Sequence, residues 1–242
     1  MSEYNFDKLI AYCNEKNIEV TDQKLSQLSS FYEMLVEKNK VMNLTGITEW
    51  DDVVLRHFID SISISEIINL SSFKGKILDL GTGAGFPGIP LKIMFPNLDI
   101  VLFDSLNKRI KFLQEVIDEL GLCGIEAIHG RAEEFGRNIS YREKFDLVVS
   151  RAVANISTLS EYCLPFVKVG GCFISYKTES IEDEIKNSGK AVTILGGKIS
   201  KVSHFSLYDS DMERALLQID KIKSTGKKFP RKAGLPSKEP LY

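Results

Sequence analysis

The sequence has none of the features typical of a membrane, secreted or zinc-binding protein. No apolar run approaches the ~18 residues that a membrane helix needs, and the start, MSEYNFDKLIAYC, has two early acids and no apolar signal core. The cysteines form no CxxC pair and have no histidine at ligand spacing; they are Cys13, Cys123, Cys163 and Cys172. We therefore expect free thiols in a cytoplasmic protein with no metal site and no membrane span.

Net charge is small, but it is unevenly distributed along the chain. The whole chain carries −2, whereas residues 221–238 contain seven lysines and arginines and no acid. That segment is +7, and the other 24 bases and 33 acids leave −9. A basic end on an acidic body is typical of a tail that contacts a polyanion, the alternative being a terminus that only aids solubility.

Residues 1–70 have the pattern of helices. Thr21 and Asp22 are typical of an N-cap and a first helical turn. The apolar residues that follow recur at three- and four-residue steps, which indicates one buried helix face: Leu25, Leu28, Phe31, Tyr32, Leu35 and Val36. Residues 43–46 (NLTG) interrupt this pattern, and a further helical pattern covers 49–70.

From Lys76 onward, short apolar runs alternate with helical stretches. The expected strands are 76–81, 100–105, 125–130, 145–152 and 171–177, and the expected helices between them are 89–95, 107–121 and 156–168. This alternation predicts a parallel, doubly wound α/β sheet. Residues 191–207 and 214–223 then predict two consecutive strands joined by a turn, so that the sheet closes with an antiparallel hairpin.

We accordingly divide the chain into three parts. Residues 1–70 form an N-terminal helical segment packed on the core, residues 71–226 form the α/β domain, and residues 227–242 form a basic C-terminal arm. Pro230, Gly234 and Pro236 interrupt regular structure in the last part, so we expect an extended arm from Lys227.

A glycine-rich loop, DLGTGAGFPG (79–88), follows the first strand and precedes a helix. Its glycines permit a tight turn and a close approach to a ligand, although a purely structural turn is an open alternative. A dinucleotide fingerprint would need a third glycine where Phe86 stands. The loop therefore argues against an NAD-dependent dehydrogenase.

Three acidic or small residues follow the next two strands. Asp104 ends the second strand, 23 residues after Gly81, where a carboxylate can accept hydrogen bonds from both ribose hydroxyls of a nucleoside. Asp104 or Ser105 as a helix N-cap is the alternative. After the third strand, Ala132 is small enough for close approach of an adenine and Glu133 is placed to read its amine, unless Glu133 only begins a solvated helix.

Taken together, the motifs resemble the RsmG (GidB) methyltransferase family, whose members methylate N7 of a guanine in 16S ribosomal RNA. The motifs that carry the resemblance are NLTGIT (43–48), RHFIDS (56–61), DLGTGAGFPGIPL (79–91), FDSLNKR (103–109), RAEEF (131–135), SRAVA (150–154) and KKFPRKAGLPSK (227–238). The resemblance implies a class I methyltransferase Rossmann-like fold, a mostly parallel seven-stranded sheet ending in an antiparallel hairpin. It also implies S-adenosyl-L-methionine as cofactor.

The resemblance and the loop pattern assign candidate site residues. Cofactor binding is expected at Asp79, Gly81, Gly83, Phe86, Asp104, Ser105, Leu106, Ala132, Glu133 and Arg151. RNA binding is expected at Arg56, His57, Lys227, Lys228, Arg231 and Lys232, with a purely structural role as the alternative for His57. The expected partner is 16S ribosomal RNA or the small ribosomal subunit, bound by a monomer without a metal ion.

The end of the fourth strand predicts which base is modified. Ser150-Arg151-Ala152 contains neither (D/N)PP(Y/F), which grips exocyclic amines, nor the Pro-Cys of cytosine-C5 enzymes. Guanine N7 carries a free lone pair and no proton, so its methylation needs alignment and electrostatics rather than a general base. Arg151 is the catalytic candidate, as a ligand of the cofactor carboxylate, the guanine edge or a phosphate.

Three other functions are less consistent with the sequence. A methyltransferase of another RNA or of a small molecule shares the loop and Asp104, but a small-molecule enzyme does not need a +7 tail. A dehydrogenase is disfavoured by Phe86 and the closing hairpin. A non-catalytic RNA-binding protein is expected to have lost Gly81, Gly83 or Asp104, and all three are present.

Overall fold

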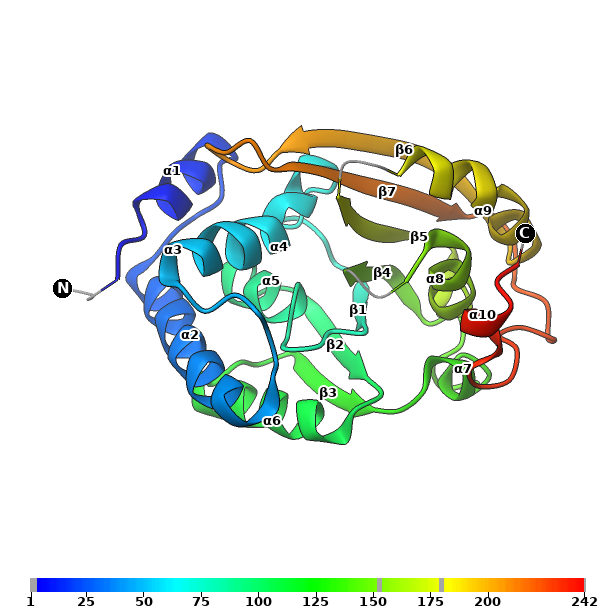
Figure 1. The fold of residues 1–242 in the computed structure, drawn as a ribbon, viewed down its shortest axis with the longest axis horizontal. Coiled ribbons are helices and arrows are strands. Elements are labelled where there is room, and N and C mark those ends of the chain that lie inside the picture. The colour runs from blue at the N-terminus through cyan, green and yellow to red at the C-terminus, as the bar shows by residue number, and fades with distance from the viewer. Residues whose placement is uncertain (1–3, 152–153, 179–180, 242) are drawn as a thin grey trace.

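The computed structural model describes residues 4–151, 154–178 and 181–241. A seven-stranded sheet in the order β3-β2-β1-β4-β5-β7-β6 runs through the middle of the molecule, with helices on both faces (Figure 1). The strands are β1 (Lys76–Leu80), β2 (Asp99–Asp104), β3 (Ile125–His129), β4 (Phe145–Arg151), β5 (Val167–Thr178), β6 (Gly197–Ser206) and β7 (Glu213–Lys221). The first five are parallel, and β7 is antiparallel to both of its neighbours. The expected sheet with its closing hairpin is confirmed.

Helices surround the sheet and precede it. They are α1 (Asp7–Glu15), α2 (Asp22–Met42), α3 (Trp50–Val53), the π-helix η1 (Val54–Ile59), α4 (Asp60–Ile62), the 3₁₀-helix η2 (Ser63–Glu66), α5 (Gly88–Met94), α6 (Asn107–Glu119), α7 (Ala132–Phe135), α8 (Ile156–Cys163), α9 (Glu182–Ile194) and α10 (Leu235–Lys238). Among the described residues, none of the helices is long and apolar enough to span a bilayer.

Two hydrophobic clusters lie on opposite faces of the sheet. Successive residues of β1 point to alternate faces, so Ile77 joins one cluster and Leu78 the other. The first cluster also contains the buried apolar residues of α1, α2 and η1, so the N-terminal helices share a core with the sheet. Both faces are covered, which is why most residues of the central strands β1, β2 and β4 are buried and apolar.

Helix α2 and the break after it follow their sequence signals. The Thr21 side chain accepts a hydrogen bond from the Lys24 backbone N–H, as an N-cap does. Leu28, Phe31 and Leu35 form the buried face. Asn43 ends the helix in the left-handed conformation, with φ of 50°, and this turn directs residues 43–48 toward the carboxyl edge of the sheet.

Two element boundaries were wrong. The helix α9 was not expected, and it includes residues 191–194, which were assigned to a strand. The strand β5 begins at Val167, within the expected helix 156–168, because α8 ends at Cys163. Ala152 and Val153 of the fourth-strand motif lie outside the described residues.

The expectation of an extended C-terminal arm was also wrong. Phe229, Pro230 and Pro236 are buried, and the segment crosses α7 and α8 (Figure 1). The guanidinium of Arg231 makes three hydrogen bonds to the carboxylate of Glu161, which is fully buried in α8. Arg142 donates to three backbone oxygens of the same segment, those of Thr225, Gly226 and Phe229. These polar contacts hold residues 225–236 against the domain.

The pair between Arg231 and Glu161 generates a stability prediction. In Arg231→Ala the Glu161 carboxylate stays buried without its counter-charge, so we expect a loss of about 3–5 kcal/mol in the free energy of unfolding. Adding Glu161→Gln should recover most of this loss, because the buried charge is then gone. Urea unfolding of the three proteins is the measurement, with Lys238→Ala, at an exposed position of the same segment, as the control. A loss below about 1 kcal/mol for Arg231→Ala would mean that the segment contributes little to the fold.

Candidate active site

A cavity of about 510 Å³ opens at the carboxyl ends of β1, β2 and β4. The strand order reverses at β1, between β2 and β4, and such switch points leave a crevice where ligands bind. One end of the cavity is lined by the glycine loop and by residues after β2 and β3, and the other by Leu44, Thr45, His57, Phe86 and Arg151.

The side chain of Asp79 holds the glycine loop in place through hydrogen bonds. Its Oδ2 accepts hydrogen bonds from the Thr82 hydroxyl at 2.7 Å and from the Gly88 backbone N–H at 2.8 Å. Oδ1 is buried and has no hydrogen-bond partner among the described residues. Asp79 does not line the cavity, so the structure places this cofactor candidate behind the loop that it shapes.

Two loop glycines serve different purposes. Gly83 has φ of +62°, and a Cβ there would meet only the Gly81 carbonyl oxygen at 4.0 Å, so the loop leaves open space on the cavity side. At Gly85, with φ of +102°, a Cβ would lie 2.7 Å from Ile89 and 2.9 Å from Leu113, both core residues. Close ligand approach therefore concerns Gly83, whereas Gly85 is needed for packing.

Asp104 lies where a ribose acceptor is expected, but its carboxylate is already largely engaged. Oδ2 accepts from the Gly83 N–H at 3.0 Å and from Arg109 at 3.2 Å, and Oδ1 accepts from the Leu106 N–H at 2.9 Å. A carboxylate offers about four lone-pair directions. One therefore remains for a ribose hydroxyl, and a second hydroxyl would have to displace Arg109.

Small, acidic and aromatic side chains line the part of the cavity near α7. Ala132, Glu133 and Tyr162 line it, together with Ser105 and the backbone around Gly130. The Glu133 carboxylate is buried, and its Oε1 accepts a hydrogen bond from the Gly234 N–H at 2.8 Å. The C-terminal segment thus buttresses this wall. Leu106 is not part of the lining and is exposed beside it.

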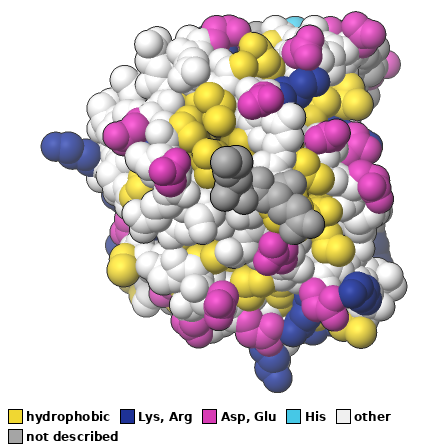
Figure 2. Space-filling model, turned by 90° about the vertical axis from the view of Figure 1, so that its left-hand side faces the viewer, with side chains coloured by type: hydrophobic (Ala, Val, Ile, Leu, Met, Phe, Trp, Pro, Cys, Tyr) yellow, Lys and Arg dark blue, Asp and Glu magenta, His cyan; other side chains and the backbone are white. Residues whose placement is uncertain are grey.

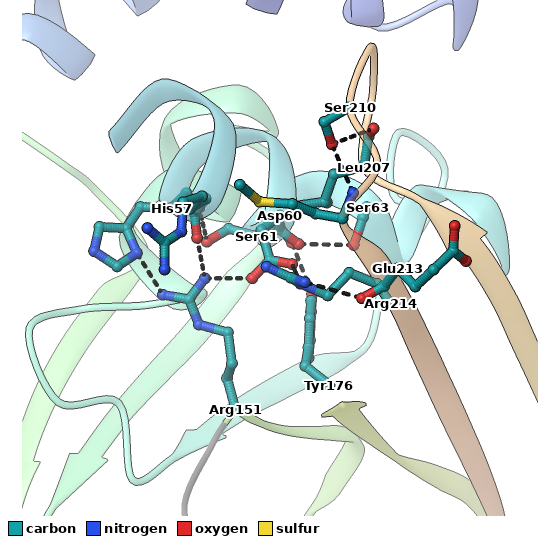
Figure 3. Close-up of polar contacts among 12 residues, drawn as sticks. His57, Asp60, Ser61, Ser63, Arg151, Tyr176, Leu207, Ser210, Glu213 and Arg214 are labelled. Atoms are coloured by element: carbon teal, nitrogen blue, oxygen red, sulfur yellow. Dashed lines mark hydrogen bonds and ion pairs between the residues drawn. The ribbon is translucent and has the colours of Figure 1, made fainter. Parts of the chain in front are cut away.

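Arg151 connects the end of β4 to the helical segment above it. One of its terminal nitrogens donates to Asp60 Oδ2 at 2.7 Å and to the Arg56 carbonyl, and the other donates to His57 Nδ1 at 3.2 Å (Figure 3). The guanidinium also lies 5.0 Å from the centre of the Phe86 ring. Three of its five N–H donors are accounted for by these groups, and two can serve a ligand.

His57 is buried and electrically neutral. Its ring stacks on Phe86 at 4.3 Å, with 8% of the residue exposed. Burial, followed by the charge of Arg151, lowers the pKa of His57 to about 3. Because both ring nitrogens are hydrogen-bonded, to Arg151 and to Thr45, the side chain is held in one orientation. This environment favours a structural role for His57, which holds Arg151 and Thr45 in place, over RNA binding.

Asp60 was not predicted, although its contacts organise this region. Its second oxygen accepts from Arg214 of β7 at 3.0 Å, so one buried carboxylate joins the start of α4 to β4 and to β7. The RHFIDS motif contained the only available signal, since Asp60 follows Arg56 by four residues on a helix. Thr45, Arg109 and Tyr162 also line the cavity and were missed as individual site residues.

The expected RNA-binding residues separate into two groups. Arg56 lies on η1, half exposed, beside a second cavity of about 420 Å³ on the far side of Arg151. Lys227, Lys228 and Lys232 are exposed on the packed C-terminal segment. Arg231 is paired with Glu161 and is therefore not available as a free cation.

Acidic residues gather on another face. Figure 2 shows many Asp and Glu side chains on the face near the N-terminus. One surface cavity near the N-terminus is lined by five acidic residues: Asp7, Glu49, Asp51, Asp52 and Asp209. Acidic residues near the N-terminus and basic residues of the C-terminal segment are thus separated in the structure as well as along the sequence.

Comparison with known sequences gives a consistent result. The chain matches the family described as rRNA small subunit methyltransferase G over residues 24–217. A Clostridium novyi (strain NT) protein named Ribosomal RNA small subunit methyltransferase G is 48% identical over 236 residues, 98% of this chain and 97% of that protein. A protein of the same name from Acetivibrio thermocellus is 51% identical over 224 residues, covering 93% of this chain and 91% of the relative.

Solved structures match more distantly. A SAM-dependent methyltransferase from Aquifex aeolicus superposes with a TM-score of 0.51 at 17% identity, covering 69% of this chain and 92% of that one. Aeropyrum pernix fibrillarin, solved with natively bound S-adenosyl-L-methionine, gives a TM-score of 0.50 at 17% identity, covering 66% and 72%. At this identity the likeness concerns the fold, and it confirms the expected class I methyltransferase architecture.

The environment of Asp79 generates a pH prediction. Burial raises the pKa of Asp79 from 3.8 to about 7. Between about pH 4 and 7 the folded protein holds this proton while the unfolded chain releases it, so this group lowers stability as pH rises, by up to roughly 1.4 kcal/mol per unit. We therefore expect Asp79→Asn, in which the side chain stays neutral, to lose less stability than the wild type between pH 5 and pH 7.

Urea unfolding without cofactor at the two pH values measures this difference. Asn can still accept the hydrogen bonds of Thr82 and Gly88 through its carbonyl oxygen, so the loop is preserved. A difference between the two proteins that does not change with pH would contradict the raised pKa.

Proposed function

Because the chain belongs to the rRNA small subunit methyltransferase G family, we propose that it transfers a methyl group from S-adenosyl-L-methionine to N7 of a guanine in 16S ribosomal RNA. The cofactor supplies an electrophilic methyl group on a sulfonium. Relatives of that name are 48% and 51% identical to this chain over nearly their full length, and this similarity supports the RNA substrate. The choice of N7 is supported by the chemistry of the cavity.

We place the transferred methyl group at the end of the cavity lined by Leu44, Thr45, His57, Phe86 and Arg151, and the assignment to N7 rests on the lack of a base among the described residues there. Leu44, Phe86 and Arg151 cannot accept a proton, and both nitrogens of neutral His57 are occupied. Among the described residues at this end, no side chain is therefore poised to deprotonate an amine. N7 has no proton to lose, so positioning and electrostatics suffice there.

The roles of the other residues follow from their places in the cavity. Asp104 accepts from a ribose hydroxyl, and the wall of Ala132, Glu133 and Tyr162 receives the adenine. The two remaining donors of Arg151 are suited to the carboxylate at the other end of the cofactor. Because Asp60 and His57 fix the orientation of the guanidinium, the Arg151 side chain does not have to be ordered further when the ligand binds.

The C-terminal segment is proposed as an RNA-binding ridge rather than a flexible arm. Lys227, Lys228 and Lys232 project from a backbone that α7 and α8 hold in place, beside the wall formed by Glu133. In this proposal the N-terminal helical segment is residues 1–70 and the methyl-transfer domain is residues 71–226. The ridge belongs to residues 227–242. We propose that the protein acts as a monomer in the cytoplasm and needs no metal ion.

The product of the reaction tests the proposal directly. Small ribosomal subunits and free 16S RNA that lack the modification should acquire label from methyl-labelled cofactor, and digestion should release 7-methylguanosine. Mass spectrometry of the nucleosides is the measurement. Methyladenosine or methylcytidine as the only product would exclude the N7 assignment, and transfer to neither RNA would exclude ribosomal RNA as the substrate.

The lysine ridge makes a separate prediction. The logarithm of the RNA-binding constant falls as the logarithm of the salt concentration rises. Replacing Lys227, Lys228 and Lys232 with Gln should make this fall less steep by about 2 to 3 units, because each phosphate contact contributes about 0.7–0.9. The control replaces three exposed lysines of α9 and β6, Lys186, Lys198 and Lys201, with Gln. RNA affinity at several salt concentrations is measured for both variants. Equal slopes for the two would show that the ridge does not contact RNA.

A further inference from the structure

The loop formed by the NLTGIT motif (43–48) contributes Leu44 and Thr45 to the lining of the cavity. Asn39 of α2 fixes this loop: its side-chain oxygen accepts from the backbone N–H groups of Leu44 and Thr45, and its amide donates to the Thr45 carbonyl. The Thr45 side chain is therefore presented to the cavity by a loop with defined geometry. It lines the same end as His57, Phe86 and Arg151.

The hydrogen-bond direction at Thr45 follows from Arg151. A guanidinium only donates, so His57 Nδ1, 3.2 Å from it, must be the acceptor. The imidazole is neutral, so its proton is on Nε2. Nε2 lies 2.9 Å from the Thr45 hydroxyl oxygen and donates to it.

A second donor fills the remaining lone pair of that oxygen. The Ile47 backbone N–H donates to Thr45 Oγ1 at 3.0 Å. A hydroxyl has one proton and two lone pairs, and both lone pairs are now used. Among the described residues no acceptor binds the hydroxyl proton. Thr45 thus offers the cavity a hydrogen-bond donor and no acceptor.

We propose that the Thr45 hydroxyl selects the target base by donating a hydrogen bond to guanine O6. This inference rests on the proposed methylation of guanine N7. The edge of guanine that carries N7 presents two acceptors, N7 and O6, whereas adenine presents an amine donor in place of O6. A group that can only donate pairs with guanine and meets adenine donor to donor. The bond to O6 also orients the neighbouring N7 toward the methyl group.

The test varies the atom at position 6 of the base. The methylated nucleotide is first located in the wild-type product, and subunits are then assembled with guanosine, inosine or 6-thioguanosine at that position. Inosine keeps O6 and N7, whereas 6-thioguanosine replaces O6 with sulfur, a weak acceptor. We expect Thr45→Val to lower kcat/KM about tenfold for guanosine and inosine and to change it little, in comparison, for 6-thioguanosine.

The ratio between bases separates recognition from structural damage. Thr45→Val also removes the acceptor for His57 and Ile47, and this affects all three substrates alike, so it cancels in the ratio. Thr45→Ser keeps the hydroxyl and should keep the wild-type preference. Thr48→Val makes the same chemical change at a threonine outside the cavity and should leave the preference unchanged.

A second readout does not depend on turnover. Affinity of the three RNAs is measured in the presence of S-adenosylhomocysteine, which carries no transferable methyl group. We expect the wild type to bind the guanosine RNA more tightly than the 6-thioguanosine RNA, and Thr45→Val to lose this difference.

The outcomes distinguish this inference from the function on which it rests. A wild-type product other than 7-methylguanosine would overturn the proposed function itself. If 7-methylguanosine forms but Thr45→Val slows the three bases by the same factor, or Thr45→Ser behaves like Thr45→Val, the role of the hydroxyl is overturned and the proposed function stands.

Discussion

The carboxylate of Asp60 is the interaction on which the candidate active site depends. It lies between two arginines, Arg151 at the end of β4 and Arg214 at the start of β7, and is itself carried by the helical segment that begins with η1. A buried carboxylate needs such partners, because its desolvation is otherwise unfavourable. Figure 3 shows how the three elements converge on it. The N-terminal helices are therefore part of the site, since they carry the group that fixes the orientation of Arg151.

The π-helix η1 explains why this geometry is possible. A π-helical turn is wider than an α-helical one, and such turns are frequent at functional sites. Here it places His57 against Phe86 while Asp60, three residues later, faces Arg151. The cavity and the second cavity beyond Arg151 share His57 and Arg151 as a common wall. A change in the position of either side chain would therefore alter both cavities.

The fold could be predicted because its signals are local. The glycine loop follows β1, Asp104 ends β2 and Glu133 lies just after β3, so their positions at one edge of the sheet follow from the alternation of strands and helices. Helix α9 was missed because its buried residues, Ser188, Ala191 and Val192, form a short and weakly apolar pattern. The pairs Arg231–Glu161 and Arg214–Asp60 join residues 70 and 154 positions apart, and no pattern in one sequence links them. The packed tail and the fixed arginine therefore required the structure.

The hydrogen bond from Gly234 to Glu133 has a consequence for the order in which the cavity is completed. Glu133 precedes β4, β5 and β7 in the chain, whereas its partner follows all of them. During folding the sheet can form around the glycine loop while Glu133 still lacks this donor. The wall beside the nucleoside is finished only when residues 229–236 have packed on α7 and α8. A chain with a complete sheet but an undocked C-terminal segment would thus still hold an incomplete binding site.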